Sequence, residues 1–219
     1  MTSAGLTNAL RHMTLALGAL TLLAGCPSIA TLHTATPVGK GKMEVTASPG
    51  VAGWTGLGDD WSGALAFGTN ETSYYWVPTI DVAFRYGVTD DLDVGFALSG
   101  FYQFKVDVKL AVIDNHRMTV AIGPSVGVNW AETFLPELPV YIDLHLGEHV
   151  RINLAGKYAP WVASNGEVMH AVGGHAGMEF LVNDDFAIAP GVDLLGFVHD
   201  TVPDGALFAT FFVACRVRP

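Results

Sequence analysis

Hydrophobic and polar residues alternate along most of this chain, and residues 83–98 show the pattern most clearly. Phe84 and Tyr86 share one face with the apolar residues that follow the turn, whereas Arg85 and Asp93 point to the other face. A period of two is that of a half-buried strand, because successive side chains point to opposite sides. The stretch therefore predicts two antiparallel strands joined by a polar hairpin turn.

The same arrangement recurs at three further short turns, at residues 113–116, 146–149 and 182–185, while the other connections are mostly longer. Alternation of short and long connections is typical of up-and-down barrels. Residues 91–113 keep one parity, but 22 rises of about 3.3 Å exceed one membrane crossing, so we place a break at Gly100. We expect ten strands, with eight as the alternative, at about residues 42–48, 74–86, 92–99, 102–112, 118–130, 140–146, 150–158, 168–181, 186–195 and 207–217.

Composition indicates the environment of this barrel. Half of the 219 residues are hydrophobic and only 15% are charged, against about 25% in ordinary soluble domains. Beyond the N-terminal region, no continuous apolar run reaches the length of about 20 residues that a transmembrane helix needs. The sequence therefore predicts an all-β, up-and-down antiparallel transmembrane β-barrel over residues 42–219, in which every backbone group is paired. The net charge of -10 argues against nucleic-acid binding.

The two faces of the predicted strands divide sharply. One face is almost wholly apolar and is expected to meet lipid, whereas the other mixes charged residues with Gly and Ala and is expected to line a narrow lumen. Buried charges need partners, so we predict a structural network of charges that fills the lumen. The expected pairs are Arg85 with Asp93, Asp93 with Lys109, His145 with Arg151, His175 with Asp193 and, across the closure of the first and last strands, Glu44 with Arg216.

The N-terminal region has the features of an export signal. Met13–Leu23 is an apolar run of 11 residues preceded by Arg11, too short to span a bilayer but suited to a signal peptide. It ends in Leu23-Ala24-Gly25-Cys26, which resembles the lipobox of bacterial lipoproteins. The resemblance implies cleavage before Cys26 and attachment of a lipid to it. We expect a signal peptide at residues 1–25 and a lipid-anchored tether at residues 26–41, with the N-terminus anchored on the periplasmic side.

Over residues 42–217 the pattern of strands and turns resembles that of small bacterial outer-membrane barrel proteins. This resemblance implies a place in the bacterial outer membrane, with membrane lipid and the barrel assembly machinery as partners. It also implies a non-enzymatic role, either structural, in surface interaction or in the passage of a small solute, although neither a solute nor a surface partner can be named.

Two alternatives come from other classes of protein. Outer-membrane proteases of the omptin type carry Asp-Asp and Asp-His pairs at the rim, and Asp59, Asp60, His199 and Asp200 supply the same residue types here. A periplasmic lipoprotein with a soluble, lipocalin-like barrel would instead turn its apolar face inward to bind a ligand.

Metal and cofactor chemistry find no support in the sequence. The closely spaced histidine pairs, His145/His149 and His170/His175, do not place both rings on one strand face, and no phosphate-binding glycine motif occurs. We expect no catalytic residues, no metal and no cofactor.

Overall fold

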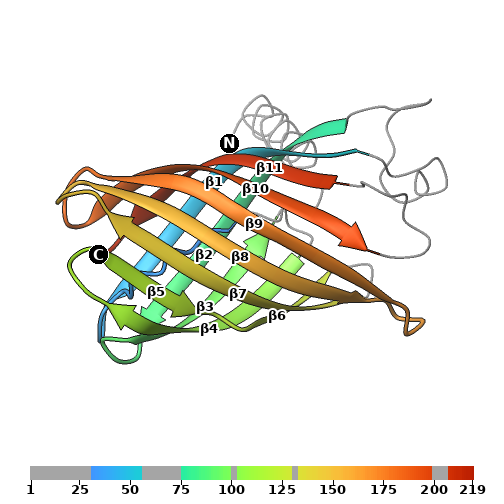
Figure 1. Ribbon diagram of the computed structural model, residues 1–219, viewed down its shortest axis with the longest axis horizontal. Helices are drawn as coiled ribbons and strands as arrows, with labels where there is room; N and C mark the ends of the chain where they lie inside the picture. Colours follow the sequence, from blue (N-terminus) through green and yellow to red (C-terminus); the bar gives the residue numbers. More distant parts are fainter. Residues whose placement is uncertain (1–30, 56–74, 100–102, 130–132, 199–206) are drawn as a thin grey trace, which may run out of the picture.

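The computed structural model describes residues 31–55, 75–99, 103–129, 133–198 and 207–219, and over these residues the protein is a β-barrel (Figure 1). None of these residues belongs to a helix that is long and apolar enough to cross a membrane. All strand pairings are antiparallel. The strands are β1 (Met43–Thr55), β2 (Tyr75–Gly87), β3 (Leu92–Ser99), β4 (Gln103–Asp114), β5 (Met118–Ile122), β6 (Ser125–Asn129), β7 (Phe134–His145), β8 (Val150–Val162), β9 (Val168–Leu181), β10 (Phe186–Val198) and β11 (Leu207–Val217).

The sheet closes on itself. β1 pairs with both β2 and β11, and β3 pairs with β4, so the described sheet has no free edge strand. β5 and β6 both lie between β4 and β7 and together make one crossing of the wall. The predicted ten-stranded, antiparallel up-and-down barrel is therefore confirmed, and the eight-stranded alternative is wrong.

The break between β5 and β6 falls at Gly123 and Pro124, inside a stretch predicted as one strand. Pro124 has no N–H to donate to a ladder, and the facing strand β4 shifts its register between Ala111 and Ile113. Gly123 also lies where the ring of Tyr141 passes, because an added Cβ would be 2.6 Å from that ring. The strand is thus interrupted where a proline and a bulky lumen side chain coincide.

Two strands extend into stretches expected to be loops. β1 runs on to Thr55, although a loop was expected from residue 49, and β7 starts at Phe134 and passes through Pro136 and Pro139. Pro139 lies beside the break in the neighbouring crossing, where its carbonyl accepts the Gly123 N–H at 3.1 Å. Prolines are tolerated in strands where the ladder is already irregular, which explains why they did not end the strand.

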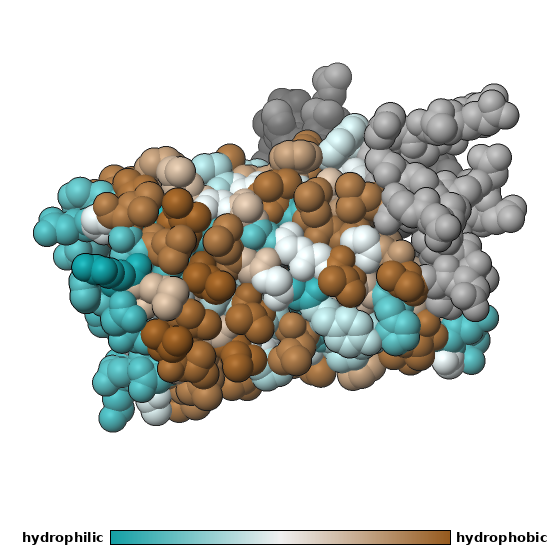
Figure 2. Space-filling view, viewed as in Figure 1, coloured by the Kyte–Doolittle hydropathy of each residue, from teal (hydrophilic) through white to brown (hydrophobic). Residues whose placement is uncertain are grey.

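The outer wall is apolar over its middle and polar at the end with the short turns (Figure 2). This placement agrees with the expected division of the two strand faces. A soluble protein rarely leaves so large a continuous apolar surface in water. The exposed apolar side chains of the wall include Trp76, Tyr86, Phe96, Phe104, Val106, Leu110, Val128, Leu138, Tyr158, Val172, Leu194, Phe211 and Val213.

Residues 31–38 lie inside the barrel. Most of them are buried, so this described part of the predicted tether at residues 26–41 is packed within the lumen. Composition suggested a linker because the stretch is rich in Thr, Gly and Pro, but such residues also suit an extended chain bound by its backbone. We call residues 31–38 the lumen segment.

The chain leaves the lumen at the short-turn end through a tight turn. Gly39 and Gly41 have positive φ angles of 91° and 75°, which favour glycine. The Gly41 N–H donates to the Gly87 carbonyl at 2.8 Å, and a Cβ on Gly87 would come within 2.0 Å of the Gly39 carbonyl oxygen. Close backbone contact between these glycines therefore leads the chain from the lumen into β1.

At the opposite end the lumen is apolar from β8 round to β2. Leu195 and Phe208 pack there with small alanines and with the partly buried Trp161. Trp161 thus belongs to the lumen. On this side of the barrel the interior changes from polar at the short-turn end to apolar at the end with the long connections, whereas β4 and β7 carry the Lys105–Glu137 ion pair near that end.

Candidate functional site in the barrel lumen

The wall binds both the N–H donors and the C=O acceptors of the lumen segment's main chain. Its N–H groups donate to three aspartates of the wall: Thr31 to Asp193 at 2.9 Å, Thr36 to Asp143 at 2.7 Å, and Val38 to Asp93 at 3.2 Å. These carboxylates come from β10, β7 and β3, on different sides of the barrel. The wall thus presents acceptors along the whole length of the segment.

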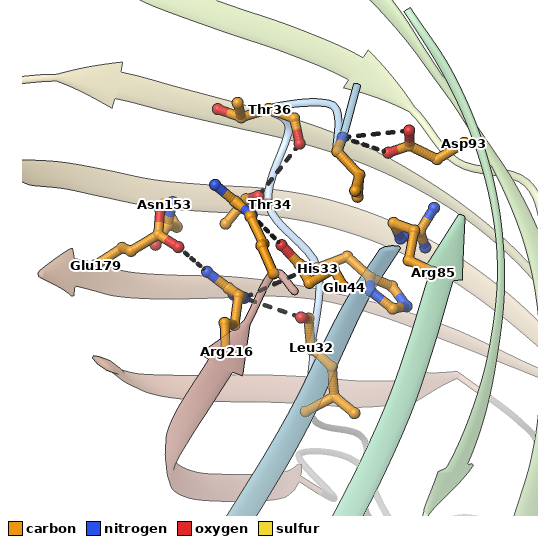
Figure 3. A network of polar contacts seen from close by, with 12 residues as sticks. Leu32, His33, Thr34, Thr36, Glu44, Arg85, Asp93, Asn153, Glu179 and Arg216 are labelled. Atoms are coloured by element: carbon orange, nitrogen blue, oxygen red, sulfur yellow. Dashed lines mark hydrogen bonds and ion pairs between the residues drawn. The ribbon is translucent and has the colours of Figure 1, made fainter. Parts of the chain in front are cut away.

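The carbonyls of the segment meet cations. Lys109 donates from Nζ to the Thr34 and Thr36 carbonyls at 2.9 and 2.8 Å. Arg216 donates from Nη2 to the Leu32 carbonyl at 3.4 Å, and Figure 3 shows this contact together with Thr34 and Thr36 of the segment. Hydrogen bonds to charged groups are stronger than those between neutral groups, so the segment is bound as an extended peptide ligand would be.

The side chains of the segment add both polar and apolar contacts with the wall. The Thr31 and Thr36 hydroxyls donate to the same carboxylates as their N–H groups, Asp193 at 2.5 Å and Asp143 at 2.7 Å. On the apolar side, Leu32 packs in a cluster with Phe212 and small alanines.

Two further side chains complete the fit. Ala35 is fully buried in a cluster with Ala121, Tyr141 and Ala155. The His33 ring nitrogen Nε2 lies 3.4 Å from the Asp107 carboxylate. The wall therefore has a separate contact for the side chain at each of positions 31, 32, 33, 35 and 36.

Asp93 and Lys109 form the predicted pair at the centre of the polar region. They face each other across β3 and β4, and Lys109 Nζ lies 3.1 Å from Asp93 Oδ2. Their side chains are 0% and 1% exposed. Because Lys109 also holds two segment carbonyls and Asp93 accepts the Val38 N–H, this pair links the wall to the segment.

Arg85 does not lie beside Asp93 as expected. It faces Gly95, and it binds the Asp107 carboxylate across that glycine. The hairpin between β2 and β3 is centred on Asp90 rather than Thr89, because the N–H groups of residues 88 and 89 both donate to the Leu92 carbonyl. That shift moves every cross-strand partner by two residues.

The closure between β1 and β11 shows a similar offset. Arg216 faces Thr46, and Glu44 lies two positions nearer the short-turn end, with 4.0 Å between Arg216 Nε and Glu44 Oε1. Glu44 instead accepts from Arg218 at 2.7 Å, while Arg216 binds Glu179 of β9. The expected pair is close in space but is not the main contact of either residue.

The remaining predicted pairs face each other as expected from the register. His175 Nδ1 lies 3.2 Å from Asp193, and Lys157 Nζ lies 3.3 Å from the same carboxylate. His145 faces Arg151 across β7 and β8.

Each member of the His145–Arg151 pair has another partner. His145 contacts the Thr119 hydroxyl at 3.3 Å, and Arg151 lies 3.4 Å from Glu179. Facing positions in the ladder therefore do not always bond, because long side chains reach diagonal neighbours.

The predicted charge network lacked the lumen segment and five wall or C-terminal residues that bond within it, Asp107, Asp143, Lys157, Glu179 and Arg218. Asp143 receives hydrogen bonds from neutral donors, the N–H and hydroxyl of Thr36 and the Asn153 amide at 2.8 Å. A signal was present, since the chain has 21 acidic against 11 basic residues and many acids occupy lumen positions. An excess of buried carboxylates requires donors from elsewhere.

Several predicted residues lie outside the described part of the chain. These are Cys26 and the four residues of the omptin-like alternative, Asp59, Asp60, His199 and Asp200. Within the described ranges, no group of three or more His, Cys, Asp or Glu side chains is arranged to hold a metal ion.

Comparison with known proteins gives distant structural likenesses only. No family model and no curated protein matches the sequence. The chain is similar to the outer membrane protease OmpT from Escherichia coli, at 8% identity and a TM-score of 0.46, over 87% of this chain and 99% of that one. For an outer membrane channel from Pseudomonas putida F1 the values are 10%, 0.45, 82% and 96%, and for Ail of Yersinia pestis 12%, 0.32, 82% and 99%. At such values none of these likenesses carries an argument, and the fold follows from the strand pairing itself.

Replacing Lys109 with methionine is expected to lower the free energy of unfolding by about 3–5 kcal/mol, because the Asp93 carboxylate would stay buried without its cation. Lys40→Met is the control, since Lys40 is exposed and its loss should cost about 0.5 kcal/mol or less. Urea unfolding in detergent micelles measures both, and equal stabilities would contradict the role assigned to Lys109.

Proposed function

We propose that this protein is a non-enzymatic barrel of the bacterial outer membrane whose lumen is closed by its own N-terminal segment, and that it has a structural or surface-interaction role. The observation that carries this proposal is the buried lumen segment. Residues 31–38 occupy the interior, bonded to Asp93, Asp143 and Asp193, and the surrounding ion pairs fill the polar half of the barrel.

The apolar outer wall supports the membrane location. Lipid requires exposed apolar side chains and a fully paired backbone, and a closed barrel with this outer face has both. A lipocalin-like soluble barrel would place its apolar side chains inside, but here the lumen holds Asp93, Lys109 and Arg216, all buried. The soluble alternative is therefore disfavoured.

The orientation in the membrane follows from the connections. In bacterial outer-membrane barrels the short turns face the periplasm, so the exit turn at residues 39–41 would lie on that side. The proposal includes outer-membrane lipid and the barrel assembly machinery as partners. It also includes the signal peptide over residues 1–25 and the lipid on Cys26 that the lipobox resemblance implies.

Passage of a small solute is the second candidate. The hydroxyls of Ser48, Thr79 and Thr210 face the lumen and are buried without a hydrogen-bond partner among the described residues. Buried hydroxyls of this kind often bind water, so the interior between the lumen segment and the apolar end has polar groups that a small polar solute could contact.

Electrical recording in planar bilayers separates these two roles. The closed barrel is expected to insert without producing stepwise conductance, because the segment and the ion pairs occupy the lumen. Insertion is verified independently by the slower or faster migration of unheated protein on gels, which reports a folded barrel. Discrete channel openings from the wild-type protein would contradict the closed state and favour solute passage.

The membrane location is tested by a matched pair of arginine substitutions. Val106 on the wall and Val88 at the short-turn end are equally exposed, at 40% and 41%. In a bilayer, Val106→Arg should cost about 2–4 kcal/mol of folding free energy and Val88→Arg about 0–1 kcal/mol. Urea titration of folding into lipid vesicles gives both values. Similar, small costs for the two substitutions would place water, rather than lipid, around the wall.

A further inference from the structure

We propose that the lumen is a binding site for an extended polypeptide strand, and that residues 31–38 are an intramolecular ligand which another strand of the same kind can replace. This inference builds on the closure of the lumen by the segment, and it does not depend on the membrane around the barrel. The ligand class is defined by the groups that the wall presents to the segment.

Recognition of the main chain is the first ground. Six main-chain atoms of the segment are bound: three N–H groups by the carboxylates of Asp93, Asp143 and Asp193, and three carbonyls by Lys109 and Arg216. A chain that alternates N–H donors and C=O acceptors is what such a set of acids and bases can pair along its length. A small anion offers no donors for the three carboxylates, and a sugar has no peptide-spaced alternation of N–H and C=O groups.

The sequence preference of the site follows from the side-chain contacts. Hydroxyls are bound at positions 31 and 36, and small or apolar side chains are enclosed at positions 32, 35 and 38. The site is therefore expected to select an extended peptide with hydroxyl groups five residues apart and no bulky charged residue between them.

The second ground for the proposal is that the hydrogen bonds of the barrel wall do not depend on the lumen segment. The lumen segment forms no strand and takes no part in the ladder, which closes through β1 and β11 without it. Release of the segment would therefore break no hydrogen bond of the wall. The carboxylates and cations left behind could be hydrated by water entering the lumen.

The exit turn is the third ground. The segment joins β1 through Gly39 and Gly41, both at positive φ, and glycines of this kind can absorb large backbone rotations. Lys40 between them is exposed at the mouth. The segment is thus attached at one end through a short turn that can act as a hinge.

The test uses the full-length protein with Ala35→Glu, a substitution in the segment that leaves every wall residue unchanged. Ala35 is fully buried against Ala121, Tyr141 and Ala155, so a glutamate should expel the segment. Leu32→Asp is a second variant with the same purpose, because Leu32 is also buried. Release in each variant is verified by cleavage of the segment with proteinase K.

The probe is a fluorescent peptide with the sequence of residues 31–38, and its binding to detergent-solubilised protein is measured by fluorescence anisotropy. We expect it to bind the released variants about tenfold or more tightly than the wild type, because the tethered segment competes at an effective concentration in the millimolar range. A control peptide with glutamate at the position of Ala35 should not bind.

Site specificity is tested by adding Asp143→Asn to the released variant, which should weaken peptide binding about tenfold because a charged acceptor for the Thr36 position is lost. Failure of the peptide to bind either released variant would overturn the proposal. The proposal would also be overturned if Asp143→Asn did not weaken peptide binding and the control peptide bound equally well. Such a result would show that the peptide adsorbs elsewhere on the protein. Neither result bears on the conductance of the wild-type protein, which tests the closed state separately.

Discussion

Carboxylates buried inside a narrow barrel must receive hydrogen bonds, and this requirement explains why the N-terminal segment lies where it does. Asp93, Asp143 and Asp193 point into a lumen that has more acids than bases. Lysines satisfy Asp93 and Asp193 only in part, and Asp143 depends on neutral donors. The N–H groups of residues 31, 36 and 38 supply what the wall does not. Wall and segment therefore satisfy each other's polar groups, and water would have to replace the segment's donors if the segment left the lumen.

The interior has two regions with different chemistry. Ion pairs and main-chain contacts fill the half near the short turns. At the other end, Leu195, Phe208 and neighbouring small residues line the side from β8 to β2, and the Lys105–Glu137 ion pair lies on the side of β4 and β7. Ion pairs in a closed space fix the position of the segment, because each charge has few alternative partners. The apolar end needs no such pairing. A buried polar network next to apolar packing accords with a lumen that is filled by side chains and the segment rather than open to solutes.

The wall could be predicted from the sequence and the segment could not, for a physical reason. Strand faces follow a period of two that depends only on near neighbours, so the apolar face around Phe96 and the lumen face with Asp93 and Lys109 were both evident. Register depends on the centre of each turn, and one residue of error at Asp90 separated Arg85 from its expected partner. Residues 31–38 have no periodicity, because their conformation is set by groups more than 50 positions away.

The most direct measurement of the central claim is amide hydrogen exchange of residues 31–38 in the intact, folded protein. Amides that donate to buried carboxylates should exchange as slowly as those of the neighbouring strands, since both open only when the barrel interior opens. We expect strong protection at Thr31, Thr36 and Val38 and faster exchange at Lys40, whose amide donates only to the exposed Asp90 carboxylate at 3.3 Å. Exchange of all four amides at the rate of an unstructured chain would show that the segment is not held in the lumen, which would contradict a barrel closed by its own N-terminal residues.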